Sequence, residues 1–348
     1  MSLVILLLGF IPLALIGLLL FSVSFVDMIV SKAAWHYSLF YIFILFVISL
    51  SVHAHSLQFF ERHFKTPYHW KKTDTTTVLV MIISALMTFS LGHTFSFGAF
   101  LASALVGLIG SIFFRREKTV IYTGSFIGMT HTAFLPDIGC IILASIITGI
   151  VYVFSRHSFI GFGGKLGALS LIGTLTSGFF LGHSPVSLPI PNSDLRLWIV
   201  MFSLFGTGLT LVIKRFYRHD PIFASSLATL LVVGINLLIP NGFPPILLAA
   251  FMMGTFTGMA NRVVLPHVLL FYLASAISAV TMIFSQPFLE NAGGKLGTLA
   301  FIGVLATRGC VQIYHFIYLY LSIRKQRHIT PKKVKELATR VPFSSSEP

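Results

Sequence analysis

Acidic residues are scarce in this chain. Ten Asp and Glu residues stand against 24 Lys and Arg in 348 residues, and charged residues make up only 10% of the total. So few ionisable side chains cannot cover the surface of a soluble protein of this length. The ten acids lie in loops or at the ends of apolar runs, so a proton or sodium pathway built on a membrane-embedded carboxylate has no candidate, and cation antiport is disfavoured.

Cysteine and the common catalytic motifs are also lacking. Cys140 and Cys310 are far apart in apolar surroundings, which favours a packing role and argues against a disulfide framework or a metal cluster. The chain has no paired acids, no His-Glu-x-x-His, no Gly-x-Ser-x-Gly and no Walker-type loop. We therefore expect no enzymatic activity, no cofactor and no metal site.

Apolar residues, by contrast, are abundant: 55% of the chain is hydrophobic and the mean hydropathy is +0.90. Apolar runs of more than about 17 residues recur, and none alternates at period two as a barrel strand does. The first run lacks a basic leader and a cleavage site, so we expect it to be retained. The sequence predicts an all-α polytopic membrane protein of about 12 transmembrane helices. These lie near 3–26, 34–55, 76–93, 97–114, 119–135, 138–155, 163–182, 195–213, 221–240, 244–264, 267–285 and 295–323.

A long segment of the chain occurs twice. The stretch from Gly124 to Leu175 recurs without a gap 130 positions later, from Gly254 to Leu305. Gly-Ser-Phe-Ile-Gly-Met at 124–129 returns as Gly-Thr-Phe-Thr-Gly-Met at 254–259, and Gly-Gly-Lys-Leu-Gly at 163–167 returns at 293–297. A shared preference for apolar residues does not produce such matched motifs, so the chain contains an internal duplication.

The basic residues predict an orientation. With both termini in the cytoplasm of a bacterium, most Lys and Arg fall in cytoplasmic loops of the inner membrane, so the net charge of +14 needs no nucleic-acid partner. Each unit has five spans, an odd number, so the second unit enters from the opposite side and the two are inverted repeats, a class of fold in which broken or re-entrant helices occur. The predicted domains are two extra helices (1–75), the first unit (76–190), the second unit (191–323) and a basic tail (324–348).

The third span of each unit carries two glycines four residues apart, at Gly124 and Gly128 and again at Gly254 and Gly258. Such spacing lets another helix approach closely, or lets the helix break and expose backbone groups to a cavity, and the sequence leaves both open. Polar side chains that suit the wall of a pathway accompany the glycines. They are Ser125, His131, Thr255 and Asn261.

The Gly-Gly-Lys-Leu-Gly motif opens the last span of each unit. A helix amino terminus with two glycines and a first-turn lysine is a candidate anion receptor. Lys165 is equally well explained as a cytoplasmic snorkelling lysine, but this does not explain Lys295, which the predicted inversion puts outside. The candidate substrate-binding residues here are Gly163, Gly164, Lys165, Gly293, Gly294 and Lys295.

Arg308 is a further candidate for substrate binding. It lies about 20 Å into a helix that begins at Lys295, and a buried Arg at that depth is costly unless it meets water, a partner or a substrate. Alternatively, the span ends at Arg308 and residues 310–323 lie along the membrane surface. The sequence does not decide between these positions. In the first unit Gly178 takes the place of Arg308.

These features predict a secondary transporter for a small anion or anionic metabolite, with its site between the inverted units. A passive channel for a small neutral solute is one alternative, since five-plus-five inverted repeats also occur in urea channels. A membrane enzyme or assembly subunit acting on lipid-linked substrates is another. The expected partners are the solute and membrane lipids, with no nucleic acid, and a homo-oligomer is compatible with this interpretation.

Overall fold

The structure is a computed structural model that describes residues 6–30, 35–63, 70–184, 191–216 and 220–325. Within these residues twelve α-helices and two short π-helical segments follow one another. They are η1 (Leu6–Phe10), α2 (Ile11–Val30), α3 (Trp35–His63), α4 (Lys72–Phe89), η2 (Ser90–Thr94), α5 (Ala99–Phe113), α6 (Lys118–Gly128), α7 (Ile138–Ser155), α8 (Lys165–Phe180), α9 (Ser193–Phe216), α10 (Pro221–Leu238), α11 (Pro245–Gly258), α12 (Val268–Phe284) and α13 (Lys295–Lys325). The predicted tail beyond residue 325 lies outside the described residues.

The helices are apolar enough for a membrane. Among the described residues, seven helical segments are long and hydrophobic enough to cross a bilayer, and α5, α11 and α12 are shorter apolar helices. Apolar side chains on the outside of the bundle, for example Leu269 at 80% exposure, would meet lipid. The chain is therefore a polytopic helical membrane protein, as its composition predicts.

Each predicted span coincides with one α-helix, but two helices end early. The spans predicted over 119–135 and 244–264 stop being helical at Gly128 and Gly258, and α6 is only about 16 Å long. Both helices are followed by a turn that leads to a proline, Pro136 or Pro266, and a residue before proline disfavours helix. Long-range backbone hydrogen bonds replace the helical ones, as described below.

Helices α4 to α8, here the first unit, and α9 to α13, the second unit, repeat one packing pattern. In the first unit α4 packs on α6 and α7, and α8 packs on α6 and α7. In the second unit α9 packs on α11 and α12, and α13 packs on the same two helices. Between the units, α5 packs on α10 and α8 packs on α13, so the main contacts join helices that correspond in the repeat.

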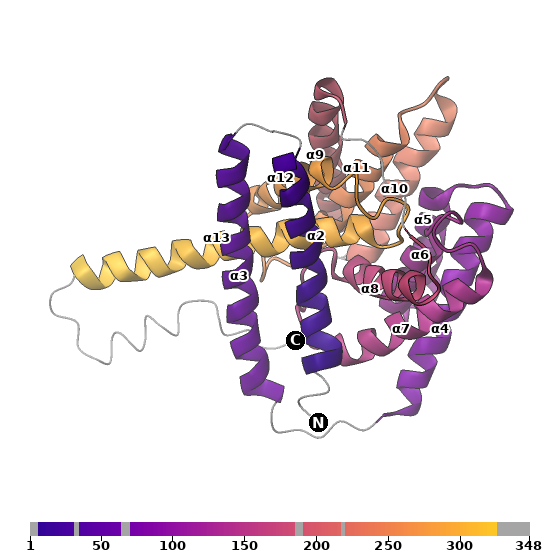
Figure 1. Cartoon of the computed structure of the whole chain (residues 1–348), viewed down its shortest axis with the longest axis horizontal. Helices are drawn as coiled ribbons and strands as arrows, with labels where there is room; N and C mark the ends of the chain where they lie inside the picture. The colour runs from indigo at the N-terminus through magenta and orange to yellow at the C-terminus, as the bar shows by residue number, and fades with distance from the viewer. Residues whose placement is uncertain (1–5, 31–34, 64–69, 185–190, 217–219, 326–348) are drawn as a thin grey trace.

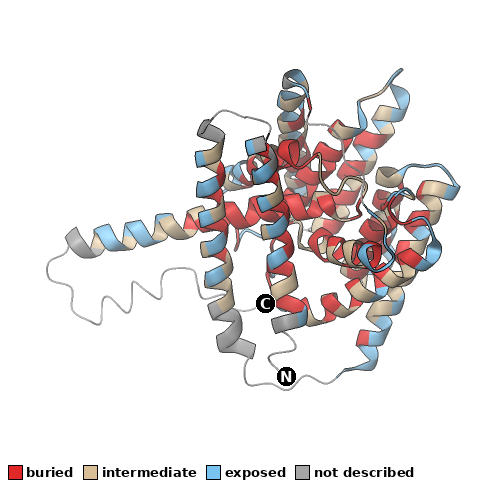
Figure 2. Cartoon of the chain, in the orientation of Figure 1, coloured by how far each residue is buried: buried red, intermediate tan, exposed pale blue. Residues whose placement is uncertain are grey.

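Helices α2 and α3 lie outside the two units. In Figure 1 the long helix α13 runs across them, and its carboxy-terminal part projects beyond α3. Figure 2 shows that α13 is buried where it passes through the bundle and exposed where it projects. One continuous helix runs past Arg308 to Lys325, so the helix does not end at this arginine.

Glycines set the close approach of helices. Gly167 in α8 and Gly297 in α13 face each other, and a Cβ added to either would lie 2.6 Å from the Cα of the other. A Cβ on Gly124 or Gly254 would likewise overlap α4 or α9. The Gly-x-x-x-Gly segments therefore serve close packing, and each helix also ends at its second glycine.

Candidate functional site

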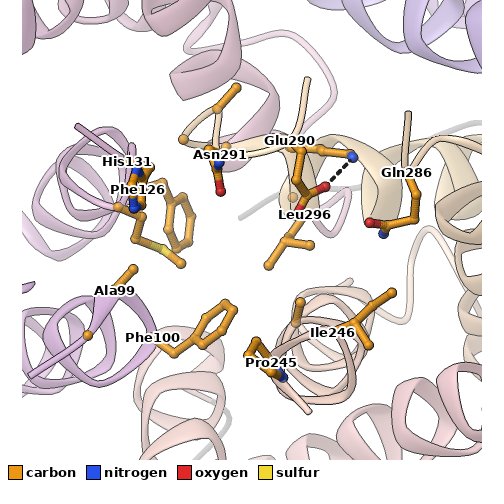
Figure 3. A pocket seen from close by; sticks show the side chains of 18 of the residues that line it. Ala99, Phe100, Phe126, His131, Pro245, Ile246, Gln286, Glu290, Asn291 and Leu296 are labelled. Carbon is orange, nitrogen blue, oxygen red and sulfur yellow. Dashed lines mark hydrogen bonds and ion pairs between the residues drawn. The ribbon is translucent and has the colours of Figure 1, made fainter. Parts of the chain in front are cut away.

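A cavity of about 820 Å³ lies between the two units. Its wall combines the π-helical end of α4 and the start of α5 with the start of α9 and α11 and the loop that leads into α13. Figure 3 looks into this hollow, with Phe100, Phe126, Pro245, Ile246 and Leu296 around it. The remaining lining residues are Gly92, His93, Gly98, Ala99, Met129, His131, Pro191, Asn192, Leu195, Ala249, Phe256, Gln286, Glu290, Asn291, Ala292, Gly293, Gly294, Lys295 and Gly297.

Four helices begin at the wall of the cavity. The first turns of α5, α9, α11 and α13 contribute Ala99, Leu195, Pro245 and Lys295 respectively. The N–H groups of a first turn have no partner within their own helix, and each helix start carries a partial charge of roughly +0.5. Each of these four helix starts therefore adds a partial positive charge to the wall, whereas the ends of η2, α6 and α12, which reach it at His93, Met129 and Gln286, add partial negative charge.

Lys295 is held in place by oxygen atoms. Its ammonium donates to the carbonyl oxygen of Ser285 at 2.9 Å and to Oε2 of Glu290 at 2.7 Å. The Lys295 side chain is only 5% exposed and that of Glu290 25% exposed. Lys295 therefore ties the loop after α12 to the start of α13, and together with Glu290 it adds no net charge to the cavity.

Two histidines, His93 and His131, lie close to the carboxy-terminal end of α6. The Nε2 atom of His93 donates to the carbonyl oxygen of Thr130 at 3.1 Å, and Nδ1 of His131 accepts from the Ala133 amide at 3.1 Å. The two rings meet edge to face with centroids 5.8 Å apart. His93 thus satisfies a carbonyl that the early end of α6 leaves without a helical partner.

Amide side chains complete the polar part of the wall. Gln286 is 2% exposed, and its amide has no hydrogen-bond partner among the described residues. Asn291 lies next to the hollow in Figure 3, and its backbone carbonyl accepts from the His131 amide at 3.0 Å. The side chain of Asn291 likewise has no partner within the described part of the chain. Neutral amides can donate to or accept from a ligand.

The two lysines of the repeated motif occupy different surroundings. Lys165 lies away from the cavity, where its ammonium donates to the carbonyl oxygens of Ser155 at 2.8 Å and Ser158 at 2.5 Å. Ser155 and Ser285 correspond in the repeat, so each lysine caps the end of the preceding helix. Gly163 and Gly164 accompany Lys165, whereas Gly293 and Gly294 line the cavity with Lys295.

The other predicted site residues are not brought to the cavity. Ser125 and Thr255 are fully buried and bond to Ser103 and Ser225 at 2.9 and 2.8 Å. Arg308 is 9% exposed and donates to the carbonyl oxygens of Val263 and Val264 at 3.4 and 3.3 Å.

Asn261 is exposed and lies away from the cavity, but it repeats a contact of the cavity wall. Its amide donates to the carbonyl oxygen of Gly161 at 2.8 Å, which repeats the bond from His131 to Asn291 in the opposite direction between the units. Of the predicted polar site residues, only His131 and Lys295 therefore line the cavity.

An ion pair and a hydroxyl chain join the units at the far end of α6. Nζ of Lys118 lies 2.8 Å from Oδ2 of Asp220, and the Tyr122 hydroxyl lies 3.0 Å from Oγ of Ser225. We call this group the latch. Helix α6 begins at the latch and reaches the cavity only at its carboxy-terminal end. Helix α10 also begins at the latch, and the chain that follows α10 reaches the cavity at Pro245.

The latch has no counterpart beside the cavity. Gly98 and Asp220 are the residues that precede α5 and α10, and the matched hydroxyl pairs show that these helices correspond. The positions equivalent to Asp220, Lys118 and Tyr122 are therefore Gly98, Leu248 and Met252, which cannot form an ion pair or the same hydrogen bond. The interface is closed by polar contacts at one end and hollow at the other.

Gln286, Asn291 and the latch belong to no sequence motif. A signal for the first two exists in the alignment of the copies: the loop before α13 carries Gln286, Glu290 and Asn291 where the first copy has Arg156, Ile160 and Gly161. Differences between the copies therefore mark part of the cavity, and the shared motif at Gly293, Gly294 and Lys295 marks another part. Comparison of the chain with models of protein families, with curated proteins and with solved structures found no match.

Proposed function

We propose that the protein is a secondary transporter that moves a small anion or anionic metabolite across the membrane through the cavity between its two units. Its transport cycle exposes the cavity first to one side of the membrane and then to the other. The observation that carries this proposal is an interface that is hollow at one end and latched at the other, although the two ends are built from corresponding helices.

Reciprocal contacts support a twofold relation between the units. His131 bonds to Asn291 and Asn261 to Gly161, and Gly167 and Gly297 approach each other with the same distances in both directions. Contacts of this kind, in which each surface meets its own equivalent, arise from a twofold axis. With five spans in each unit, we place the axis in the membrane plane, which makes the units inverted repeats.

The orientation predicted from the basic residues assigns each end of the interface to one side of the membrane. The cavity is formed where the predicted outer loops meet, around residues 92–99, 191–195, 245–246 and 286–294. Lys118 and Asp220 lie in predicted cytoplasmic loops. The conformation described is then open to the outside and closed to the cytoplasm, one of the two end states that alternating access requires.

The helix starts support an anionic substrate. Four first turns meet at the cavity, and helix amino termini bind anions through their N–H groups and dipoles. Our proposal therefore assigns attraction of the anion to these helix ends alone, whereas the sequence predicted that the helix start and the lysine ammonium act together. Lys165 and Lys295 have carbonyl or carboxylate partners already and serve to hold the helices in place.

A passive channel for a neutral solute is the second candidate. The observation in its favour is that the pair of Lys295 and Glu290 leaves the cavity without a net side-chain charge. A carrier and a channel differ in exchange: unlabelled solute on the far side accelerates labelled uptake through a carrier but not through a channel.

Reconstituted vesicles test the proposal. We expect uptake of labelled benzenesulfonate, a permanently charged anion that crosses lipid slowly, and faster uptake when the vesicles are preloaded with unlabelled benzenesulfonate. Ala99→Trp, which fills the cavity, should abolish uptake, and Ile138→Trp on an exposed helix face should not. Uptake of urea without acceleration by preloading would instead indicate the channel, and no flux of any solute would reject both.

A further inference from the structure

We infer that the cavity selects an amphipathic organic monoanion: a head group with one negative charge, held by the amides of Gln286 and Asn291 and the first turn of α13, attached to an apolar body. The inference deepens the proposed function and rests on it for its physiological meaning. It is carried by an unpartnered buried amide beside a helix amino terminus in a cavity with mostly apolar walls.

Gln286 indicates that a ligand completes this site. No hydrogen bond joins its amide to the described residues, and the amide opens onto the cavity, where water or a ligand completes its hydrogen bonds. The equivalent position in the first unit, Arg156, is satisfied by an ion pair with Asp74 at 2.9 Å. Gln286 lines the cavity and has no such partner among the described residues, so its donor and acceptor capacity is available to whatever enters.

The start of α13 supplies the positive end for the head group. Gly293 and Gly294 let this helix start pack closely against α6 and α8, and the first turn that follows them lines the cavity with Lys295, Leu296 and Gly297. The Gly293 amide itself donates to Oγ1 of Thr130 at 3.1 Å, which fixes the approach to the helix. Gln286, Asn291 and this first turn all line the same cavity.

The neighbouring carboxylate limits the charge of the ligand. Glu290 lines the cavity, and Lys295 compensates for its charge but adds none beyond it. A ligand with a second negative charge would meet this carboxylate in a partly buried site, where like charges repel strongly. The limit to one negative charge therefore follows from the Glu290 carboxylate, which would repel a second charge.

The walls and volume of the cavity indicate an organic body. Phe100, Phe126, Ile246 and Leu296 border the hollow, and the volume of about 820 Å³ is far greater than an inorganic ion fills. Pockets of roughly 300–1,000 Å³ with mainly apolar walls and a few polar groups are typical of sites for small organic molecules. The apolar body of the ligand would lie against these four side chains.

Binding to the purified full-length protein in detergent tests this site without any requirement for transport. The probes are benzenesulfonate, its neutral analogue benzenesulfonamide, and sulfate, which carries two charges and no apolar body. We expect titration calorimetry to show the tightest binding for benzenesulfonate. Equal binding of benzenesulfonamide, or tighter binding of sulfate, would overturn the inference.

Substitution of Gln286 tests the head-group contact. Because a hydrogen bond to a charged group contributes more than a neutral one, Gln286→Leu should weaken benzenesulfonate binding by about tenfold or more. Gln286→Glu keeps the shape and repels the anion, so it should abolish binding even if the leucine variant proves unstable. Gln312→Leu, further along α13 and away from the cavity, is the matched control and should bind like the parent. Unchanged affinity in both Gln286 variants would refute the inference.

Binding and transport can fail separately. Selective binding that depends on Gln286, in a protein whose vesicles show no exchange, would refute transport and leave the site standing. Exchange of neutral solutes with no binding of benzenesulfonate would refute the anion site and leave transport standing.

Discussion

Removal of the latch charge should shift the protein toward a state open to the cytoplasm. The substitution Asp220→Asn isolates this charge, because the two carboxylate oxygens of Asp220 have separate tasks. Oδ1 caps α10 by accepting from the amides of Ile222 and Phe223 at 3.1 and 3.3 Å, and Oδ2 accepts from Lys118. Asn is as good a helix cap as Asp, so the variant keeps the cap and loses the ion pair.

The size of the effect follows from the exposure of the pair. The Lys118 and Asp220 side chains are 28% and 23% exposed, so solvent screens the attraction only in part. Measured pairs at protein surfaces contribute up to about 1 kcal/mol, and we take that value for this pair. A change of about 1 kcal/mol alters a two-state ratio about fivefold. Because the pair exists only in the latched state, the ratio should move by this factor away from the state described here.

Cysteine accessibility measures this ratio. In a chain whose own Cys140 and Cys310 are replaced by Ala, a cysteine at Phe100 reports the cavity and a cysteine at Ile222 reports the equivalent position at the latched end. Phe100 lines the cavity, whereas Ile222 is 1% exposed. Asp220→Asn should slow the reaction of position 100 with a membrane-impermeant thiol reagent and accelerate that of position 222 about fivefold.

The neighbouring variant Glu117→Gln is the control for this experiment. It removes an acidic charge close to the latch but leaves the ion pair of Lys118 and Asp220 in place. Its rates should match those of the parent. If Asp220→Asn leaves both rates unchanged, or if it accelerates both positions together, the latch does not hold one end of the interface closed.

Two further predictions concern the repeated motif. Gly167→Ala and Gly297→Ala should each lower the unfolding temperature, because each added Cβ meets the opposite helix, and overpacking of this kind costs about 1–3 kcal/mol. The control Gly139→Ala should leave the unfolding temperature unchanged, because a Cβ there meets nothing within 4 Å. Similar losses at 167 and 297 are expected from their reciprocal contacts, and a loss at one position alone would contradict them. Lys165→Met should reduce stability and spare benzenesulfonate binding, whereas Lys295→Met, which leaves an unpaired carboxylate in the cavity, should weaken that binding. Thermal unfolding and calorimetry of both variants check this difference, and equal effects on binding would argue against it.

The helices were predictable because hydropathy is a local property. Each apolar run became one helix, from Ile11–Val30 at the start to Lys295–Lys325 at the end. The exact ends of α6 and α11 were not predictable in this way, since a mixture of polar and apolar residues follows Gly128 and Gly258. There the backbone turns to make hydrogen bonds with the other unit, and these partners lie 100 and 160 residues away in the sequence.

The candidate site was predictable only in part. The motif with Gly293, Gly294 and Lys295 does lie at the cavity, where the loop after α12 enters α13. The sequence could not tell that the Lys295 ammonium is bound by the end of α12, because that contact depends on the path of a loop. Gln286 can be identified as a candidate site residue only once its place in the cavity and its lack of a hydrogen-bond partner are known, and both are properties of the packed structure.

The inverted arrangement of the two units is tested most directly by the sides on which two equivalent loops lie. The loop before α6 contains Arg115, and the equivalent loop before α11 contains Asn241; both residues are exposed. With single cysteines at these positions in membrane vesicles of known orientation, we predict that an impermeant reagent labels position 241 only from outside and position 115 only from the cytoplasmic side. Labelling of both positions from the same side would contradict the account.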